Sequence, residues 1–412
     1  MNATAVVHEP GPRAVRSKRS RKPLRRKLIS IHRWSALILG VVLVVQSTSG
    51  AILLYRAELF RARHASFYHH TDAPPVIDTE RAVTLVRETD PGFDVGWVGM
   101  DGGVIVIGNA QYTAAYSVDP GTGRINERAN LTDGVLGWLV NLHDCAFGCA
   151  RYSGVIPMLE NQAPLIDITW AAMILGLLGL LLVSLAVSGA VIWWPSLKRL
   201  RHGFRVRWRK GRFARDRDLH NVIGVLAVPF LLMWGITGIT IELPAVQRAW
   251  LVATGGNANL LRTEKFFVPR SVDTGRAPIP IGEVGAIVHR AAPGRLAYLL
   301  LPTDAAPYYR ATVAGAYSPR EHRLFYSGDV MVYVNVYDES DIKVVDASHD
   351  RPLANTFYAK VFEPAHFGWM VNGWWRLVWL AFGLTPLALA VTGLSTWLLR
   401  RRTRHRRERA RT

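Results

Sequence analysis

The run DLHNVIGVLAVPFLLMWGITG, residues 218–238, decides the fold of this 412-residue chain. It opens the apolar segment Leu219–Leu243, which exceeds the ~20 residues that a helix needs to cross the hydrocarbon core of a bilayer. Half of all residues are hydrophobic, and three further segments have the same character: Trp34–Tyr55, Ile168–Trp194 and Trp375–Leu399. The sequence therefore predicts a helical membrane protein with four transmembrane helices, the fourth kinked at Pro386.

The net charge of +19 is concentrated in three segments beside the ends of these spans. Residues 13–27, 198–217 and 400–411 carry 9, 10 and 8 Lys or Arg, and only two acids, Asp216 and Glu408. An even number of crossings puts all three on one side, which the positive-inside rule assigns to the cytoplasm. We expect a multi-pass protein of the bacterial inner (cytoplasmic) membrane with cytoplasmic termini, in which the charge serves topology and binds no nucleic acid.

The two long loops on the opposite side are large enough for small folded modules. In the first, a helix at Thr79–Thr89 precedes strands near Val95–Met100, Val104–Asn109 and Ala114–Val118. In the second, a helix at Ile281–Arg290 precedes strands at Leu296–Leu301, Tyr309–Ala314 and Met331–Tyr337, so it reads as a degenerate copy.

The expected domains alternate between the two sides of the membrane. They are a basic cytoplasmic tail (1–27), transmembrane helix 1 (28–55), a periplasmic domain (56–167), transmembrane helix 2 (168–194), a basic cytoplasmic loop (195–218), transmembrane helix 3 (219–243), a second periplasmic domain (244–374), transmembrane helix 4 (375–399) and a basic cytoplasmic tail (400–412).

Histidines and small residues recur at matching places in the two halves. His32 precedes Gly50 by 18 residues, and His220 precedes Gly238 by 18 residues. In both halves a Ser or Thr stands directly before the glycine. The second and fourth spans carry similar pairs, Ser188-Gly189 and Thr392-Gly393. One further histidine precedes each of these two spans, His143 before the second and His366 before the fourth. The pattern predicts two repeated two-span hairpins with one histidine at each membrane face.

Packing two such hairpins around a shared axis would bring His32 opposite His220 on the cytoplasmic side and His143 opposite His366 outside. Two imidazoles on facing helices suit haem iron, because the porphyrin fills the four equatorial positions. Zinc normally requires three or four protein ligands. The alternative is that each histidine is a membrane anchor or a hydrogen-bonded polar residue without a metal.

Two arginines and two cysteines near these histidines suggest an anion contact and a disulfide, respectively. Arg33 and Arg217, at the cytoplasmic mouths, suit the propionates of a haem. Cys145 and Cys149 lie in an exported segment, where an oxidising compartment permits a disulfide. Their spacing does not match the C-x-x-C-H of c-type haem attachment.

The chain resembles the PepSY-associated transmembrane family, also called iron-regulated membrane proteins, over roughly residues 28–400. The resemblance rests on the motifs SIHRWSALILG, TSGAILLY, VDPGTGRI, LVNLHD, VSGAVIWWPSLKRL, DLHNVIGVLAVPFLLMWGITG and HFGWMVNGWWRLVWLAFGLTPLALAVTGLSTWLLRR. It implies a membrane α-helical fold with two periplasmic α+β PepSY-like modules. Members include inner-membrane ferrisiderophore reductases, which bind two b-type haems through histidines and pass electrons outward to release iron. On this resemblance His32, His143, His220 and His366 are the axial ligands.

We therefore expect a dihaem electron-transfer protein, a haem-dependent oxidoreductase of the ferric-chelate reductase type. Its acceptor would be a ferric siderophore or another periplasmic compound. A cytoplasmic reductase or the quinone pool would supply electrons, since no strand is followed by the G-x-G-x-x-G fingerprint of a nucleotide site.

Two other functions remain open. The protein can be a non-enzymatic scaffold whose PepSY-like modules bind a periplasmic protein or peptide. It can also be a transporter of iron chelates, although polar residues inside the spans are sparse, chiefly Gln46 and Glu242, which disfavours a hydrophilic pathway.

Overall fold

The computed structural model describes residues 22–164, 167–194, 200–260, 267–270, 275–314, 330–346, 352–371 and 373–410. Within these residues, four helical segments are long and apolar enough to cross a membrane. They are α1 (Lys22–Leu53), α6 (Trp170–Trp193), α8 (Arg212–Glu242) and the consecutive helices α14 (Trp375–Gly383) and α15 (Thr385–Arg409). The prediction of four membrane helices is confirmed, whereas residues 1–21 of the basic tail and 195–199 of the basic loop lie outside the described residues.

The fourth membrane segment is interrupted where the sequence predicts a kink. Helix α14 ends at Gly383, and α15 begins at Thr385 with Pro386 in its first turn. Proline fits the first turn of a helix because its missing N–H would have no partner there, and its ring prevents the preceding helix from continuing.

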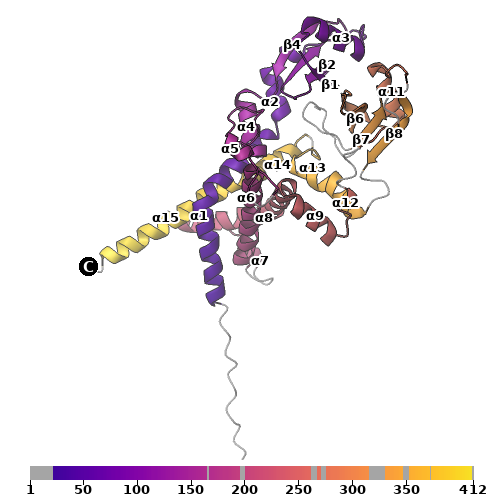
Figure 1. Ribbon diagram of the computed structural model, residues 1–412. Coiled ribbons are helices and arrows are strands. Elements are labelled where there is room, and N and C mark those ends of the chain that lie inside the picture. The colour runs from indigo at the N-terminus through magenta and orange to yellow at the C-terminus, as the bar shows by residue number, and fades with distance from the viewer. Residues whose placement is uncertain are drawn as a thin grey trace, which may run out of the picture.

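The membrane helices form a ring in which α1 and α8 each pack against both α6 and α15. Helices α1 and α8 begin, and α6 and α15 end, at what we call the tail end; the opposite end is the sheet end (Figure 1). Large apolar side chains such as Val41, Leu177 and Val391 point outward and are exposed, as expected for residues that face lipid. The repetition of one hairpin in the other remains a prediction.

Beyond the sheet end, the chain forms one open antiparallel sheet in the order β4-β3-β2-β1-β5-β6-β7-β8 (Figure 1). Its strands are β1 (Val95–Asp101), β2 (Val104–Asn109), β3 (Ala114–Val118), β4 (Ile125–Asn130), β5 (Arg295–Leu300), β6 (Tyr308–Ala314), β7 (Val330–Asn335) and β8 (Asp338–Asp346). The six strands expected from the sequence are present, and the edge strands β4 and β8 are additional.

The two modules expected from the sequence are joined into this single sheet by the pairing of β1 with β5. Trp97 lies opposite Leu300, and Gly99 lies opposite Tyr298. Each module alone would leave one of these strands as an unpaired edge, and their pairing removes two edges at once. The halves of the chain are therefore connected outside the membrane helices as well as within them.

Two amphipathic helices, α3 (Thr79–Thr89) and α11 (Ile281–Ala291), cover one face of the sheet (Figure 1). Val86 and Val288 from these helices are buried in a core with residues of both halves of the sheet, such as Ile107 and Val332. The opposite face near β1 to β4 packs against Phe60 of α2 (Arg56–Arg63) and Phe67 of η1 (Ser66–Tyr68).

Short helices connect the sheet to the membrane ring. Those that reach the functional site are α4 (Gly134–Cys145) and α13 (Glu363–His366), which follows the π-helical turn η3 (Tyr358–Phe362). The other short helices of this region in the described residues are α5 (Pro157–Glu160), α9 (Pro244–Ala253) and α12 (Leu353–Phe357). Helix α7 (Leu200–Gly203) lies instead at the tail end, between α6 and α8.

Candidate functional site

Two histidines from diagonal helices meet at the tail end of the ring. His32 of α1 and His220 of α8 have ring centres 6.5 Å apart, with ring planes at 89°. His32 Nδ1 lies 2.8 Å from the hydroxyl of Ser188 on α6. His220 Nδ1 lies 3.1 Å from the hydroxyl of Thr392 on α15 and 3.1 Å from the backbone oxygen of Leu389. The pair and its partners therefore come from all four membrane helices.

A second pair lies at the sheet end. His143 of α4 and His366 of α13 have ring centres 6.4 Å apart. His143 Nδ1 lies 2.8 Å from the backbone oxygen of Gln46 and 3.2 Å from the hydroxyl of Ser49, both on α1. His366 Nδ1 lies 2.7 Å from the hydroxyl of Thr237 on α8. Both histidines thus reach into the ring from short helices and contact the membrane helices.

The hydrogen-bond partners assign the same tautomer to all four imidazoles. Backbone oxygens can only accept, so the Nδ1 atoms of His143 and His220 carry the proton. The side-chain amide of Gln46 lies 3.2 Å from Nδ1 of His143, but it donates at the shorter distance of 2.7 Å to the backbone oxygen of His143. The hydroxyls of Ser188 and Thr237 donate to the carbonyl four residues earlier on their own helices, both at 2.6 Å, so they too must accept from Nδ1–H. The lone pair of every ring then lies on Nε2, which has no hydrogen-bond partner within the described residues.

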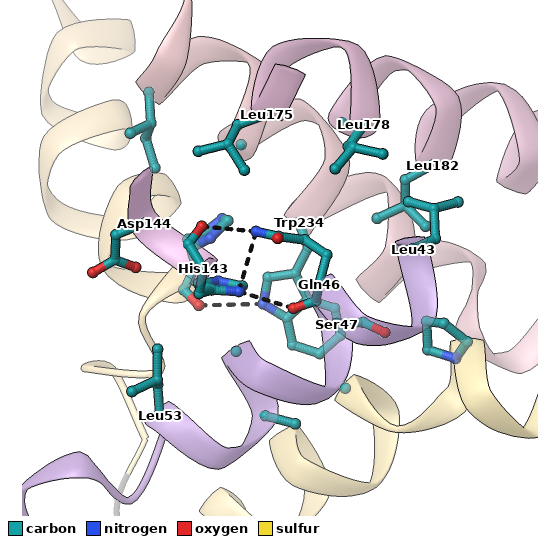
Figure 2. A pocket seen from close by; sticks show the side chains of 18 of the residues that line it. Leu43, Gln46, Ser47, Leu53, His143, Asp144, Leu175, Leu178, Leu182 and Trp234 are labelled. Atoms are coloured by element: carbon teal, nitrogen blue, oxygen red, sulfur yellow. Dashed lines mark hydrogen bonds between the residues drawn. The ribbon is translucent and has the colours of Figure 1, made fainter. Parts of the chain in front are cut away.

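A cavity of about 350 Å³ lies beside the sheet-end pair (Figure 2). This volume is in the range of small-molecule and cofactor sites. Its wall is mostly apolar and includes leucines of α1, α6 and α8, together with Gly50 and Gly238. Figure 2 shows Gln46, His143 and Trp234 converging on one side of it. The cavity can therefore admit a largely apolar ligand next to both imidazoles.

The glycines that follow the hydroxyl residues leave room for the rings. A methyl group at Gly50 would stand 2.8 Å from Nε2 of His143, closer than side chains tolerate. At Gly189 and Gly393 it would stand 3.3 Å from Cε1 of His32 and His220, respectively. The small pairs noted in the sequence therefore border the histidines directly.

The imidazole of His366 is held neutral. Burial, together with the neighbouring His143, lowers the pKa of His366 to about 3. At neutral pH the ring is therefore an uncharged ligand with a free lone pair. The carboxyl groups of Asp144 and Glu242 also line this cavity.

The last turn of α4, which carries His143, is closed by a covalent link. Cys145 and Cys149 are joined by a disulfide. Between them, Ala146 and Phe147 adopt left-handed backbone angles, with φ of 42° and 66°. Such conformations are costly for residues with a side chain and persist only where the surroundings impose them.

The π-helical turn η3 precedes α13, the short helix that carries His366, and is held by two polar contacts. Lys360 in this turn is almost fully buried, and its Nζ lies 3.0 Å from Asp346 Oδ1 of β8. The hydroxyl of Tyr358 donates to Thr240 of α8 at 3.1 Å. π-Helical turns are rare and frequently lie at functional sites. This one connects the sheet to the position of His366.

The geometry of both pairs fits a metal held between two imidazoles. With about 2 Å for each metal–nitrogen bond and roughly 1.1 Å from that nitrogen to the ring centre, such rings stand about 6 Å apart. No group of three or more His, Cys, Asp or Glu side chains suited to a metal ion occurs in the described part of the chain. Two-ligand sites of this kind suit iron whose other positions are filled by a porphyrin.

The two arginines expected to meet propionates differ in the structure. Arg33, beside His32, has a buried Nε without a hydrogen-bond partner among the described residues. Arg217 is exposed to solvent. Arg33 is therefore the better placed of the two to bind an anionic group near the tail-end pair.

The sequence showed the hydroxyl–glycine pairs only as part of a repeated pattern and did not reveal their contacts with the histidines. It also did not reveal that Gln46 and Trp234 both donate to backbone oxygens of the sheet-end histidines. A signal was present: Gln46 follows His32 by 14 residues, and Trp234 follows His220 by 14 residues.

The fold and these two pairs define a membrane-spanning protein with an extramembrane sheet and two partly buried histidine sites. The chain belongs to the family described as the PepSY-associated TM region, whose model matches residues 29–400. No curated protein matches the chain significantly.

Proposed function

We propose that this protein is a transmembrane dihaem electron carrier that reduces a periplasmic ferric chelate, such as a ferric siderophore, and thereby releases iron. Two b-type haems would be held by His32 with His220 and by His143 with His366. The observation that carries the proposal is that all four Nδ1 atoms are hydrogen-bonded, while none of the four Nε2 atoms has a hydrogen-bond partner among the described residues.

The residues present fit this cofactor in two further ways. The cavity at the sheet end has the apolar lining that a porphyrin requires. The buried, unpartnered Nε of Arg33 is a donor for a propionate at the tail end. When bound, haem would supply an iron that gains and loses one electron.

The placement of the pairs supports transfer across a bilayer. His32 and Gly50 are 18 residues apart on α1, which corresponds to roughly 27 Å along the helix axis. The two pairs thus lie near opposite faces of a hydrocarbon layer about 30 Å thick. The basic segments support an orientation with the tail end in the cytoplasm of a bacterial inner membrane, where a reductase or the quinone pool would donate electrons.

Haem content is the first test. Protein purified in detergent from haem-supplied cells should contain two haems per chain, with the split α-band of low-spin iron after reduction. His143→Ala and His366→Ala should each leave one haem, and His405→Ala, in the exposed tail, should leave two. A purified wild type without porphyrin would contradict the proposal and favour the scaffold function.

Electron delivery is the second test. Anaerobically reduced protein should lose its reduced α-band when a ferric siderophore is added, and Fe(II) should appear in a chelator assay. The gallium(III) form of the same siderophore is the matched control, because it binds alike and accepts no electron. If neither the ferric nor the gallium(III) siderophore reoxidises the reduced protein, the chain is a haem protein with a different electron acceptor.

A further inference from the structure

We infer that Ser188 and Thr237 are positioning residues that fix the tautomers of His32 and His366, respectively, and set the reduction potential of the iron bound to each histidine. Ser49 and Thr392 make the same kind of contact with His143 and His220, which also have a backbone acceptor. The inference rests on the proposed function, because it concerns iron held by these histidines. It assigns a role to side chains that would otherwise be small packing residues in a helical ring.

Each hydroxyl proton is already committed to the helix that carries it. Ser188, Thr237 and Thr392 donate to the carbonyl four residues earlier at 2.6, 2.6 and 2.8 Å, and Ser49 donates to the carbonyl three residues earlier at 2.8 Å. A hydroxyl has a single proton. Towards the histidine, each oxygen can therefore act only as an acceptor, which forces the proton onto Nδ1 and the lone pair onto Nε2.

This acceptor also affects the metal. An imidazole that donates its second N–H becomes a more basic ligand, as in metal sites whose histidines are held by carboxylates or carbonyls. A more basic ligand favours the oxidised iron and lowers its reduction potential. Loss of the acceptor should therefore raise the potential at that site.

The four hydroxyls are not equally necessary, because two histidines have a second acceptor. His143 and His220 keep the backbone oxygens of Gln46 and Leu389 at 2.8 and 3.1 Å. For His32 and His366 the hydroxyl is the only acceptor of Nδ1–H among the described residues. Each site thus contains one histidine that depends on its hydroxyl and one that does not.

This difference supplies matched variants for both sites. Ser188→Ala should raise the midpoint potential of the tail-end haem, whereas Thr392→Val should change it little. Thr237→Val should raise the potential of the sheet-end haem, whereas Ser49→Ala should change it little. Thr237→Ser keeps the acceptor and should restore the wild-type value.

The measurement is a redox titration followed at the α-band, together with electron paramagnetic resonance of the ferric protein. Potentials are assigned by repeating each titration in His143→Ala, which retains only the tail-end haem, and in His32→Ala, which retains only the sheet-end haem. The dependent variants should also shift the resonance of their own haem and leave the other unchanged. If Thr237→Val does not accumulate, Ser188→Ala tests the same claim at the other site.

The outcomes separate the inference from the proposed function. A wild type with two haems whose potentials and resonances stay unchanged in both Ser188→Ala and Thr237→Val would overturn the inference and leave the function intact. Equal shifts in the dependent and independent variants of one site would also overturn it, because they would indicate a general packing effect. A wild type without haem would overturn the function itself.

Discussion

Gln46 of α1 and Trp234 of α8 each donate a hydrogen bond to the backbone oxygen of a sheet-end histidine. The side-chain amide of Gln46 donates to the backbone oxygen of His143 at 2.7 Å, and the indole N–H of Trp234 donates to that of His366 at 3.2 Å. Both donors anchor a short helix from the sheet domain to a membrane helix. Two chemically different side chains, an amide and an indole, therefore make the same kind of contact in the two halves of the chain.

Removing either donor should weaken the sheet end of the protein. Trp234→Phe retains most of the ring but leaves the oxygen of His366 unpaired, which costs about 1–3 kcal/mol when the oxygen is buried. Gln46→Leu should act similarly on His143. We expect a lower midpoint of thermal unfolding in detergent for both variants and no change for Trp194→Phe, whose side chain is exposed.

Double variants should reveal which histidines share a haem. His32→Ala and His220→Ala should each remove the tail-end haem, so the double variant should lose no more than either single one. His32→Ala combined with His143→Ala should lose both haems. Non-additivity of this kind identifies groups that act as one unit, and haem loss that adds within a pair would contradict the pairing.

The charges around the two sites should push their potentials in opposite directions. Arg33→Gln removes a cation beside the tail-end pair and should lower the potential there, since a positive charge favours reduced iron. Glu242→Gln removes a carboxylate from the sheet-end cavity and should raise the potential there. We expect shifts on the order of 60 mV, a tenfold change in a one-electron equilibrium, and none for Arg409→Gln in the exposed tail.

Breaking the disulfide should affect the sheet end selectively. With Cys145→Ser and Cys149→Ser combined, the left-handed turn after α4 loses its covalent closure, which we expect to cost about 2 kcal/mol by the loop-entropy relation. Haem dissociation to an apoprotein acceptor should accelerate for the sheet-end haem and not for the tail-end haem. Equal acceleration at both sites would show that the bond stabilises the protein without positioning His143.

Acid should weaken the contact between η1 and β4. Burial by itself would raise the pKa of Glu127, but hydrogen bonds from Ser66 and His64 outweigh it and lower the pKa below its usual value. The resulting stability is present above the unfolded-state pKa and is lost as pH falls through the folded-state pKa. Glu127→Gln should therefore be less stable than wild type at pH 7, and the difference in the free energy of unfolding should shrink as the pH falls below the usual carboxyl pKa of 4.5.

The membrane helices and most strands follow from the sequence because their signals are local. Continuous apolar runs identify the four spans, and Pro386 marks the break between α14 and α15. The pairing of β1 with β5 does not follow, because about 200 residues separate the strands and only tertiary packing brings them together. Strand β4 is not predicted from the sequence either, because its residues INERAN are too polar to be recognised as a strand.

The histidine sites could be predicted only in outline. The equal spacing of His32 to Gly50 and of His220 to Gly238 indicated which histidines to compare. The hydroxyl contacts could not be read from it, because each joins side chains about 95 to 170 residues apart and depends on how neighbouring helices are rotated. The disulfide was predicted from the exported location of Cys145 and Cys149, but the left-handed turn that it encloses was not.

The junction between β1 and β5 has a consequence for how the chain can be divided. The first and second halves are held together by this strand pair and by the contacts of α1 with α15 and of α6 with α8. Their association therefore does not depend on the short basic connection between α7 and α8. Two separately translated polypeptides, split within residues 204–211, have all the surfaces they need to assemble into one protein.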